Sequence, residues 1–398
     1  MTSRVAAPAF LAQFKCLGAD CEDTCCKGWN MQLDSITQAR YTREAPELFE
    51  SVTGSGENAI MKRDPASDFC VKFEGGLCGI QSRYGEQFLG DACFFYPRSA
   101  RMLGGEVAMT GTLSCPEIAR LSLLRETDPF APSMVGTERL PLSLTDYLPE
   151  GLNPTQAKAI HRRFLDSALD EAATPERNCM RIFTSADSLS HITASAWPDA
   201  VPFYFEHADA SLLAPESSET DPVYLLQALC GLVTAAKYLH HFRLMQTIRE
   251  MEQALHVTIR MDSLMIAALP DSAHAVQALQ TRWKNEWQAQ FAPLLRRYLA
   301  MQVSLALFPF AGFGMTLPQR AAVIGIRFAT VKLALMSLCQ ATNGKPQETD
   351  VVRVVQSISR FLDHLAEADF SIKIYTETGW LKPARLRGLL ADSEPAAN

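Results

Sequence analysis

Histidine is missing from the first part of this 398-residue chain, since all eight histidines lie at or beyond His161. The chain also contains no C-x2-C pair, the knuckle that common structural zinc sites present twice. The first absence disfavours an N-terminal zinc site of mixed cysteine and histidine ligands, unless the later part of the chain reaches into it. The second argues against zinc knuckles.

The sequence also lacks a recognisable targeting segment or membrane span. Residues 1–15 contain no sustained apolar core, so we expect no secretory signal. Of the most apolar segments, residues 223–236 are too short to cross a bilayer, and residues 321–339 carry Arg327 and Lys332. Both are expected to be buried core helices. The formal net charge of −7 argues against a dedicated nucleic-acid binder. We therefore expect a cytoplasmic protein with neither a membrane nor a nucleic-acid partner.

Cysteine, by contrast, is concentrated in the first third of the chain, which holds eight of the eleven cysteines. These eight are Cys16, Cys21, Cys25, Cys26, Cys70, Cys78, Cys93 and Cys115. In a reducing cytoplasm clustered thiols more often bind metal than form disulfides. The adjacent pair Cys25-Cys26 could form a disulfide only with strain. The eight are therefore candidate metal ligands.

The chemistry of the thiols leaves several arrangements open. Thiolates select zinc and iron–sulfur clusters over hard cations. Eight thiols could form two all-thiolate zinc sites, one cluster with spare thiols, or four disulfides. Softness and spacing favour an iron–sulfur cluster over zinc, and both over disulfides. The spacing does not select which four of the eight would bind.

Composition and periodicity predict a mainly α fold, with a small irregular cysteine-rich metal-binding domain on a larger all-helical body. Residues 1–127 form the cysteine-rich domain, residues 128–154 a linker rich in proline, serine and threonine, and residues 155–398 the helical domain. The clearest helical patterns cover residues 36–49, 116–125, 153–172, 318–340 and 351–368. Gly104-Gly105 predicts a hairpin turn, and the ring-rich loop of residues 308–314 is expected to pack in the core.

Several separate blocks of the N-terminal part resemble the bacterial flagellin lysine N-methylases and, more loosely, cysteine-rich proteins described as zinc- or iron-chelating. The blocks occur in order over about the first 120 residues. They are Phe14-Lys-Cys16, Cys21-Glu-Asp-Thr-Cys-Cys-Lys-Gly-Trp29, Cys78-Gly-Ile-Gln81, Leu89-Gly-Asp-Ala-Cys93 with Tyr96-Pro-Arg98, and Ser114-Cys-Pro-Glu117.

This resemblance implies transfer of methyl groups from S-adenosylmethionine to lysine amines of flagellin, and a 4Fe–4S cluster held by some of the cysteines. Radical enzymes that use this cofactor carry C-x3-C-x2-C. Here Cys21 and Cys25 begin that pattern, but Gly28 stands in the third place. We therefore expect polar methyl transfer, with a cluster that is structural or that holds the cofactor. No glycine-rich dinucleotide fingerprint is present, so neither the cofactor pocket nor a catalytic residue can be assigned from the sequence.

Three residues near the cysteines are candidates for binding the cofactor. Arg98 could bind its carboxylate through two hydrogen bonds, or could form a salt bridge with Asp91 or Glu117. Trp29 and Tyr96 could line a slot for a lysine chain or a sulfonium through cation–π contact. The residues alone favour a different role for these two rings, which is to cover the metal site from water.

Two further functions are compatible with the sequence. One is an iron–sulfur oxidoreductase or electron carrier, which would change its redox state reversibly. The other is a non-catalytic metal-binding module with a helical interaction body, which would release its metal readily to a competitor. Without the family resemblance this module would rank first.

Overall fold

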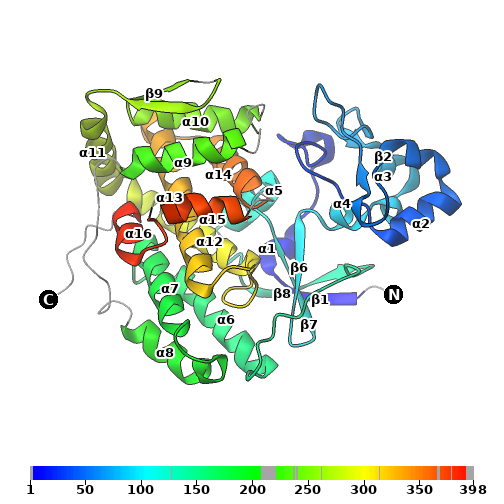
Figure 1. Ribbon diagram of the computed structural model, residues 1–398, viewed down its shortest axis with the longest axis horizontal. Coiled ribbons are helices and arrows are strands. Elements are labelled where there is room, and N and C mark those ends of the chain that lie inside the picture. Colours follow the sequence, from blue (N-terminus) through cyan, green and yellow to red (C-terminus); the bar gives the residue numbers. More distant parts are fainter. Residues whose placement is uncertain are drawn as a thin grey trace.

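The computed structural model describes residues 3–126, 128–207, 221–235, 238, 241–260, 262–312, 314–364, 368–377 and 379–390. The prediction of a mainly α protein is confirmed, because sixteen α-helices and only short sheets are formed in these ranges. Figure 1 shows a large helical part with a smaller N-terminal part beside it. We call residues 16–95 the small lobe and residues from Pro154 onward the helical body.

The small lobe is built from short elements. Its helices are α2 (Ser35–Glu44), α3 (Gly79–Tyr84) and α4 (Asp91–Phe95). Its strand pairs are β2 (Val52–Thr53) with β3 (Ile60–Met61), and β4 (Phe73–Glu74) with β5 (Leu77–Cys78). The helix predicted over residues 36–49 is divided, because α2 ends before Pro46 and a 3-10 helix, Pro46–Ser51, follows. Proline cannot donate a helical hydrogen bond and restricts the residue before it.

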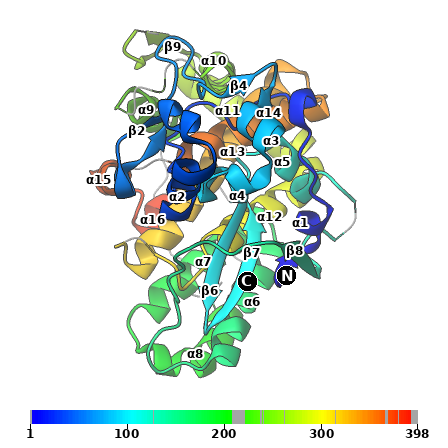
Figure 2. The ribbon, with the colours of Figure 1, turned by 90° about the vertical axis from the view of Figure 1, so that its right-hand side faces the viewer.

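A four-stranded sheet joins the small lobe to the body (Figure 2). Its strand order is β6 (Arg98–Leu103), β7 (Glu106–Gly111), β1 (Ser3–Pro8), β8 (Pro132–Thr137). The predicted hairpin is present, with Gly104 and Gly105 at positive φ between β6 and β7. Strand β1 pairs in parallel with β7 and antiparallel with β8. The predicted linker, residues 128–154, thus contains an edge strand, and the division of the chain into domains stays a prediction.

Helices occupy most of the body. They are α6 (Pro154–Leu169), α7 (Pro175–Leu189), α8 (Trp197–His207), α9 (Asp221–Ala235), α10 (Phe242–Ala254), α11 (Ser272–Arg282), α12 (Gln288–Leu305), α13 (Leu317–Ala341), α14 (Glu348–Leu362), α15 (Ala368–Glu377) and α16 (Pro383–Leu390). The body is not all-helical as predicted, because β9 (Val257–Arg260) and β10 (Met265–Ala268) form an antiparallel hairpin. Val257 and Ile259 are buried on one face of β9, the alternation typical of a half-buried strand.

Helix α13 is the central helix of the body. Asn153 and Thr316 form capping boxes that begin α6 and α13 at the predicted places. Among the described helices α13 alone is long and apolar enough to cross a membrane, but 89% of its most apolar window is buried inside the fold. Such burial is typical of a core helix.

Two hydrophobic cores are present among the described residues. The larger core extends from β1 and the sheet through α5 (Pro116–Leu123) into the helices of the body. The smaller core belongs to the small lobe and contains twelve buried residues. They are Met31, Leu33, Tyr41, Ala45, Leu48, Val52, Ala59, Met61, Cys70, Ile80, Phe88 and Leu89.

Candidate functional site

Six of the eight N-terminal cysteines line one small cavity of about 120 Å³, which we call the cysteine cavity. They are Cys16, Cys21, Cys25, Cys26, Cys78 and Cys115. These side chains come from the loop of residues 14–29, from the end of β5 and from the start of α5. The fold therefore gathers sulfur atoms from segments nearly 100 positions apart in the sequence.

Three of these thiols interact directly. Cys26 is in hydrogen-bonding contact with both Cys25 and Cys78, and this contact lowers the pKa of those two groups, that of Cys78 to about 6. The same two hydrogen bonds raise the pKa of Cys26. Burial raises the pKa of Cys21 and Cys115, so among these thiols it is Cys78 whose thiolate, the form of cysteine that binds metal, is favoured at neutral pH.

The remaining two cysteines lie behind this group. Cys70 is buried in the core of the small lobe, and its N–H donates to the Cys26 carbonyl at 2.7 Å. Burial raises the pKa of Cys93, and Cys78, Cys25 and Cys70 raise it further. All eleven cysteines are free thiols. Within the described ranges no three His, Cys, Asp or Glu side chains are arranged to hold a metal ion. The donor type fits a soft metal, and the assignment of all eight as ligands stays a prediction.

Helix α14 holds the cysteine loop against the body. Arg360 forms an ion pair with Asp23 and donates to the Lys27 carbonyl. Gln356 donates to the same Asp23 carboxylate at 2.8 Å. Burial alone would raise the pKa of Asp23, but Arg360 and the hydrogen bonds outweigh it and lower that pKa. The loop is thus fastened by a buried charge pair rather than by apolar packing alone.

Gly28 also fits closely against the body. Its φ is +84°, and a Cβ at this position would lie 2.6 Å from the Cε1 atom of the His241 ring. The sequence excluded a third radical-type cysteine here because residue 28 is glycine. The structure adds that a side chain at position 28 would overlap His241. His241 is the residue before α10, and its ring stacks on that of Tyr238.

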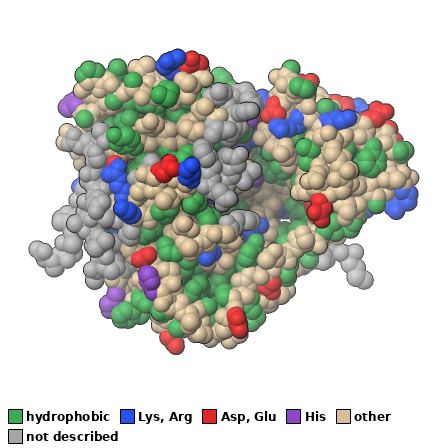
Figure 3. All heavy atoms as spheres, viewed as in Figure 1, with side chains coloured by type: hydrophobic (Ala, Val, Ile, Leu, Met, Phe, Trp, Pro, Cys, Tyr) green, Lys and Arg blue, Asp and Glu red, His purple; other side chains and the backbone are tan. Residues whose placement is uncertain are grey.

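A second cavity, of about 580 Å³, lies between the small lobe, the sheet and the body, and we call it the interlobe cavity. Figure 3 shows the surface hollowed between the two parts of the molecule. All three predicted cofactor residues, Trp29, Tyr96 and Arg98, line it. Tyr96 also lines the cysteine cavity, so one ring forms part of both walls.

The two candidate rings form a cluster with a histidine that the sequence did not single out. The Trp29 ring centroid lies 5.9 Å from that of Tyr96 and 6.2 Å from that of His364. The Trp29 indole N–H donates to the Cys25 carbonyl at 2.7 Å. Tyr96 and His364 are joined through Ser114, whose Oγ lies 3.2 Å from Tyr96 Oη and 2.9 Å from His364 Nε2. Desolvation lowers the pKa of His364, against the opposing effect of Asp363.

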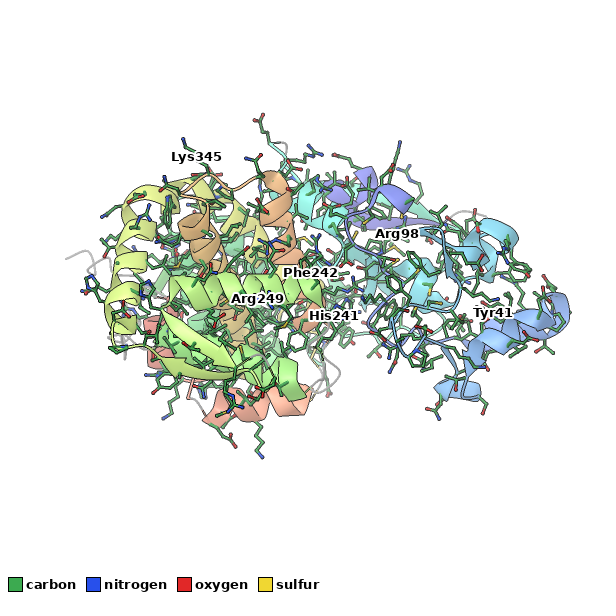
Figure 4. The ribbon with its side chains drawn as sticks, turned by 90° about the horizontal axis from the view of Figure 1, so that it is seen from above. Tyr41, Arg98, His241, Phe242, Arg249 and Lys345 are labelled. Carbon is green, nitrogen blue, oxygen red and sulfur yellow. The ribbon has the colours of Figure 1, made fainter. Side chains whose placement is uncertain are left out.

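Arg98 begins β6 at the junction of the two parts of the molecule (Figure 4). Its guanidinium carbon lies 5.5 Å from the centroid of the Phe14 ring. The alternative salt bridges are not formed, because Asp91 pairs with Arg139 and Glu117 pairs with Arg120. Within the part of the chain that the structure describes, the guanidinium group of Arg98 thus has no ion-pair partner.

The body supplies further polar groups that sequence patterns could not identify. Asp363 pairs with Arg327 at 3.2 Å, and its side chain is only 2% exposed. Burial raises the pKa of Asp363, and Arg327 opposes that rise. Both residues and His364 line the interlobe cavity. They lie in α13 and at the end of α14, more than 200 positions after Arg98, so only the fold brings them together.

Another cavity of about 600 Å³ lies within the body, between α7, α11, α12 and α13. The Lys332–Glu176 ion pair, at 2.8 Å, lies beside it. None of the predicted site residues lines this cavity. The interlobe cavity is therefore the candidate ligand site.

Known proteins are similar to part of this chain. The flagellar biosynthetic protein FliU of Salmonella muenchen is 29% identical over 139 residues, which is 32% of this chain and 80% of that protein. The lysine-N-methylases of Salmonella typhimurium and Salmonella choleraesuis are each 28% identical over 138 residues. This similarity spans only about a third (34%) of each methylase. No family model matches the chain. No solved structure matches it.

Proposed function

We propose that this protein is a protein-lysine N-methyltransferase that acts on flagellin in the cytoplasm with S-adenosylmethionine. The observation that carries the proposal is the interlobe cavity, whose wall contains two aromatic rings, a histidine and several guanidinium groups. Its volume lies in the range of small-molecule sites, roughly 300–1,000 Å³. The partial similarity to proteins named lysine-N-methylase and FliU selects methyl transfer in a flagellar context among the reactions such a cavity could support.

The residues of the cavity suit polar methyl transfer. S-Adenosylmethionine would supply the methyl group as a sulfonium. Trp29 and Tyr96 present aromatic faces, which attract an ammonium or sulfonium cation. The neutral form of His364 is favoured by its lowered pKa, so this ring can accept the one proton that a lysine ammonium must lose. Arg98 is assigned to the cofactor carboxylate. The position of the cavity between the two lobes would help to orient the amine.

The cysteine cavity is assigned to a 4Fe–4S cluster, with zinc as the alternative. Four of the six cysteines that line it would suffice to hold such a cluster, and Cys70 and Cys93 lie directly behind them. A cluster there would cross-link the loop of residues 14–29 to β5 and α5. Because Tyr96 lines both cavities, the metal would lie on the far side of a ring that forms part of the wall of the interlobe cavity. Polar methyl transfer itself requires no redox step.

The test is methylation of flagellin by the protein purified without oxygen. We expect intact-mass analysis to show flagellin gaining about 14 Da per methyl group when S-adenosylmethionine is present. His364→Asn should slow this gain by about 100-fold, the lower end of typical effects for a general base, without changing the iron content. If no flagellin lysine is modified while iron and sulfide contents are full, the methyltransferase assignment is wrong.

One observation favours a second function, a non-catalytic metal-binding module. The cysteine cavity collects six thiols irrespective of what the interlobe cavity binds. Such a module would surrender its metal to a competing chelator within minutes and would not bind S-adenosylmethionine. An iron–sulfur electron carrier would instead be reduced and reoxidised reversibly. Chelator challenge and redox titration of the same preparation separate these functions from the methyltransferase.

A further inference from the structure

The interlobe cavity contains three guanidinium groups that have no acidic partner. Arg98 and Arg101 lie on β6, and Arg320 lies in the second turn of α13. Among the described residues no Asp or Glu forms an ion pair with any of the three. The two carboxylates of the cavity are engaged elsewhere, Asp91 with Arg139 at 3.5 Å and Asp363 with Arg327 at 3.2 Å. Cations withdrawn from water without a partner destabilise a fold.

Arg320 is fixed in place by Pro309, Ala311 and Gly312 of the ring-rich loop. Its Nη1 donates to the carbonyls of Pro309 and Ala311, each at 2.7 Å. The side chain crosses Gly312, where a Cβ would lie 2.6 Å from Arg320 Cδ. Its Nε is buried without a hydrogen-bond partner. Burial lowers the pKa of Arg320. The loop thus holds a guanidinium group at the cavity without neutralising its charge.

Arg101 is even less satisfied. Among the described residues its one side-chain hydrogen bond runs from Nη1 to the Ala100 carbonyl at 3.2 Å. Its Nε is buried without a partner. Burial lowers the pKa of Arg101, and only the hydroxyl of Tyr147 opposes this effect. Two incompletely bonded cations therefore reach one cavity from the sheet and from the body.

We propose that Arg101 and Arg320 together bind a carboxylate group of the ligand that occupies the interlobe cavity. A planar guanidinium matches the two oxygen atoms of a carboxylate and is always charged. This inference rests on the proposed function and deepens it. The carboxylate has two sources to distinguish: the amino-acid end of S-adenosylmethionine, which Arg98 would then bind together with these two residues, or an acidic residue of the protein substrate.

The first test needs neither methylation nor flagellin. Calorimetric titration of the holoprotein with butyrate should show saturable binding, and butanol should show none. Arg101→Met with Arg320→Met should weaken butyrate binding by about 10-fold to 100-fold, the effect of losing charge-assisted hydrogen bonds. Arg249→Met, on the exposed face of α10 (Figure 4), is the matched control and should bind butyrate as the wild type does. Equal butyrate affinity in all three proteins overturns the proposal.

Arg101→Met alone gives a second readout that a structural role would not produce. It removes an unpaired, half-buried cation and only one hydrogen bond, so it should raise the melting temperature of the ligand-free protein while weakening butyrate binding. An arginine retained for packing would show a lower melting temperature and unchanged binding. That combination would contradict the proposal even if the double variant failed to fold.

Two further arms identify the source of the carboxylate. If the cofactor supplies the carboxylate, decarboxylated S-adenosylmethionine should bind the wild type about tenfold or more weakly than S-adenosylmethionine does. The Arg320→Met variant should then bind the two cofactors with equal affinity. A raised KM for flagellin in Arg320→Met, with equal binding of the two cofactors, assigns it to the substrate protein. If neither change is observed, no ligand carboxylate binds at Arg101 and Arg320, and the proposal is wrong. Butyrate binding without any methylation would overturn the proposed function and leave the anion site standing.

Discussion

The small lobe and the helical body are stabilised by different kinds of contact. The body shares a continuous core in which α13 is buried over most of its length. The core of the small lobe has twelve residues, and much of its remaining surface is cysteine loop. Small cores supply little net stability, so lobes of this size usually need a staple. The difference teaches that the small lobe depends on contacts outside its own core, namely the docking of its loop on α14 and, as we propose, a bound metal.

The largest effect should come from removing a central thiol. Cys25→Ser or Cys26→Ser should abolish metal binding and destabilise the small lobe, because the free energy of metal binding is partly free energy of folding. Metal analysis and hydrogen exchange of residues 16–95 measure both. Cys339→Ser is the control, because Cys339 is buried in α13. This variant should have a less stable body but an unchanged metal content. Full metal content in both Cys25 and Cys26 variants would refute this placement.

A smaller effect is expected from breaking the ion pair that fastens the cysteine loop. Arg360→Gln leaves the largely buried Asp23 carboxylate without its counter-ion, although Gln356 still donates to it, and this should destabilise docking by about 3 kcal/mol. Hydrogen exchange should rise in residues 21–28 and remain unchanged in α7. Lys332→Gln is the counterpart in the body, since it breaks the pair with Glu176. In Lys332→Gln, hydrogen exchange should rise around α7 and not in the cysteine loop. The same exchange pattern in both variants would show that the two regions unfold as one.

The Asp23 pair also predicts a dependence on pH. Because the pKa of Asp23 is lowered in the folded protein, its contribution is complete above the ordinary value of 3.8 and is lost as pH falls through the folded pKa. The wild type should therefore release the loop at acid pH, and Arg360→Gln should show a flatter profile below 3.8. Identical profiles would mean that Asp23 does not control docking.

The smallest effect is expected where the loop only touches the body. Gly28→Ala should lower the free energy of unfolding by about 2 kcal/mol, because the added Cβ overlaps His241. Gly105→Ala is the matched control, since Gly105 also has a positive φ, +77°, but no atom within 4 Å of its Cβ position. Chemical denaturation of both variants isolates the clash from the backbone strain. Equal losses would show that His241 moves aside freely.

Local sequence patterns predicted the long helices, whose apolar spacing and first residues can be recognised within a short stretch of the chain. The long helices α13 and α14 were foreseen from apolar spacing, and Asn153 and Thr316 begin helices because their side chains satisfy the first N–H groups. Strands β1 and β8 were missed, because each is a short run paired with a segment far along the chain. The alternation in β9 was likewise too short to be recognised within a helical region.

The candidate site shows the same limit. Trp29, Tyr96 and Arg98 were selected because they lie close to cysteines in the sequence, and the fold does place them on one cavity. His364, Asp363 and Arg320 carry no motif of their own. They became visible only as buried polar groups whose partners, or lack of partners, depend on distant segments. The glycine at position 312 is a signal in the sequence, because a residue without a side chain is needed where Arg320 passes close to the backbone. That contact is visible only in the structure.

Tyr96 forms part of the wall of both cavities, and this has a thermodynamic consequence. Any group that shifts this ring when it binds on one side changes the affinity of the other side, and linkage requires the two effects to be equal. Metal loading would then be felt as a change in ligand affinity, and ligand binding as a change in metal retention. The ring would thereby connect an inorganic occupant of one cavity with an organic occupant of the other.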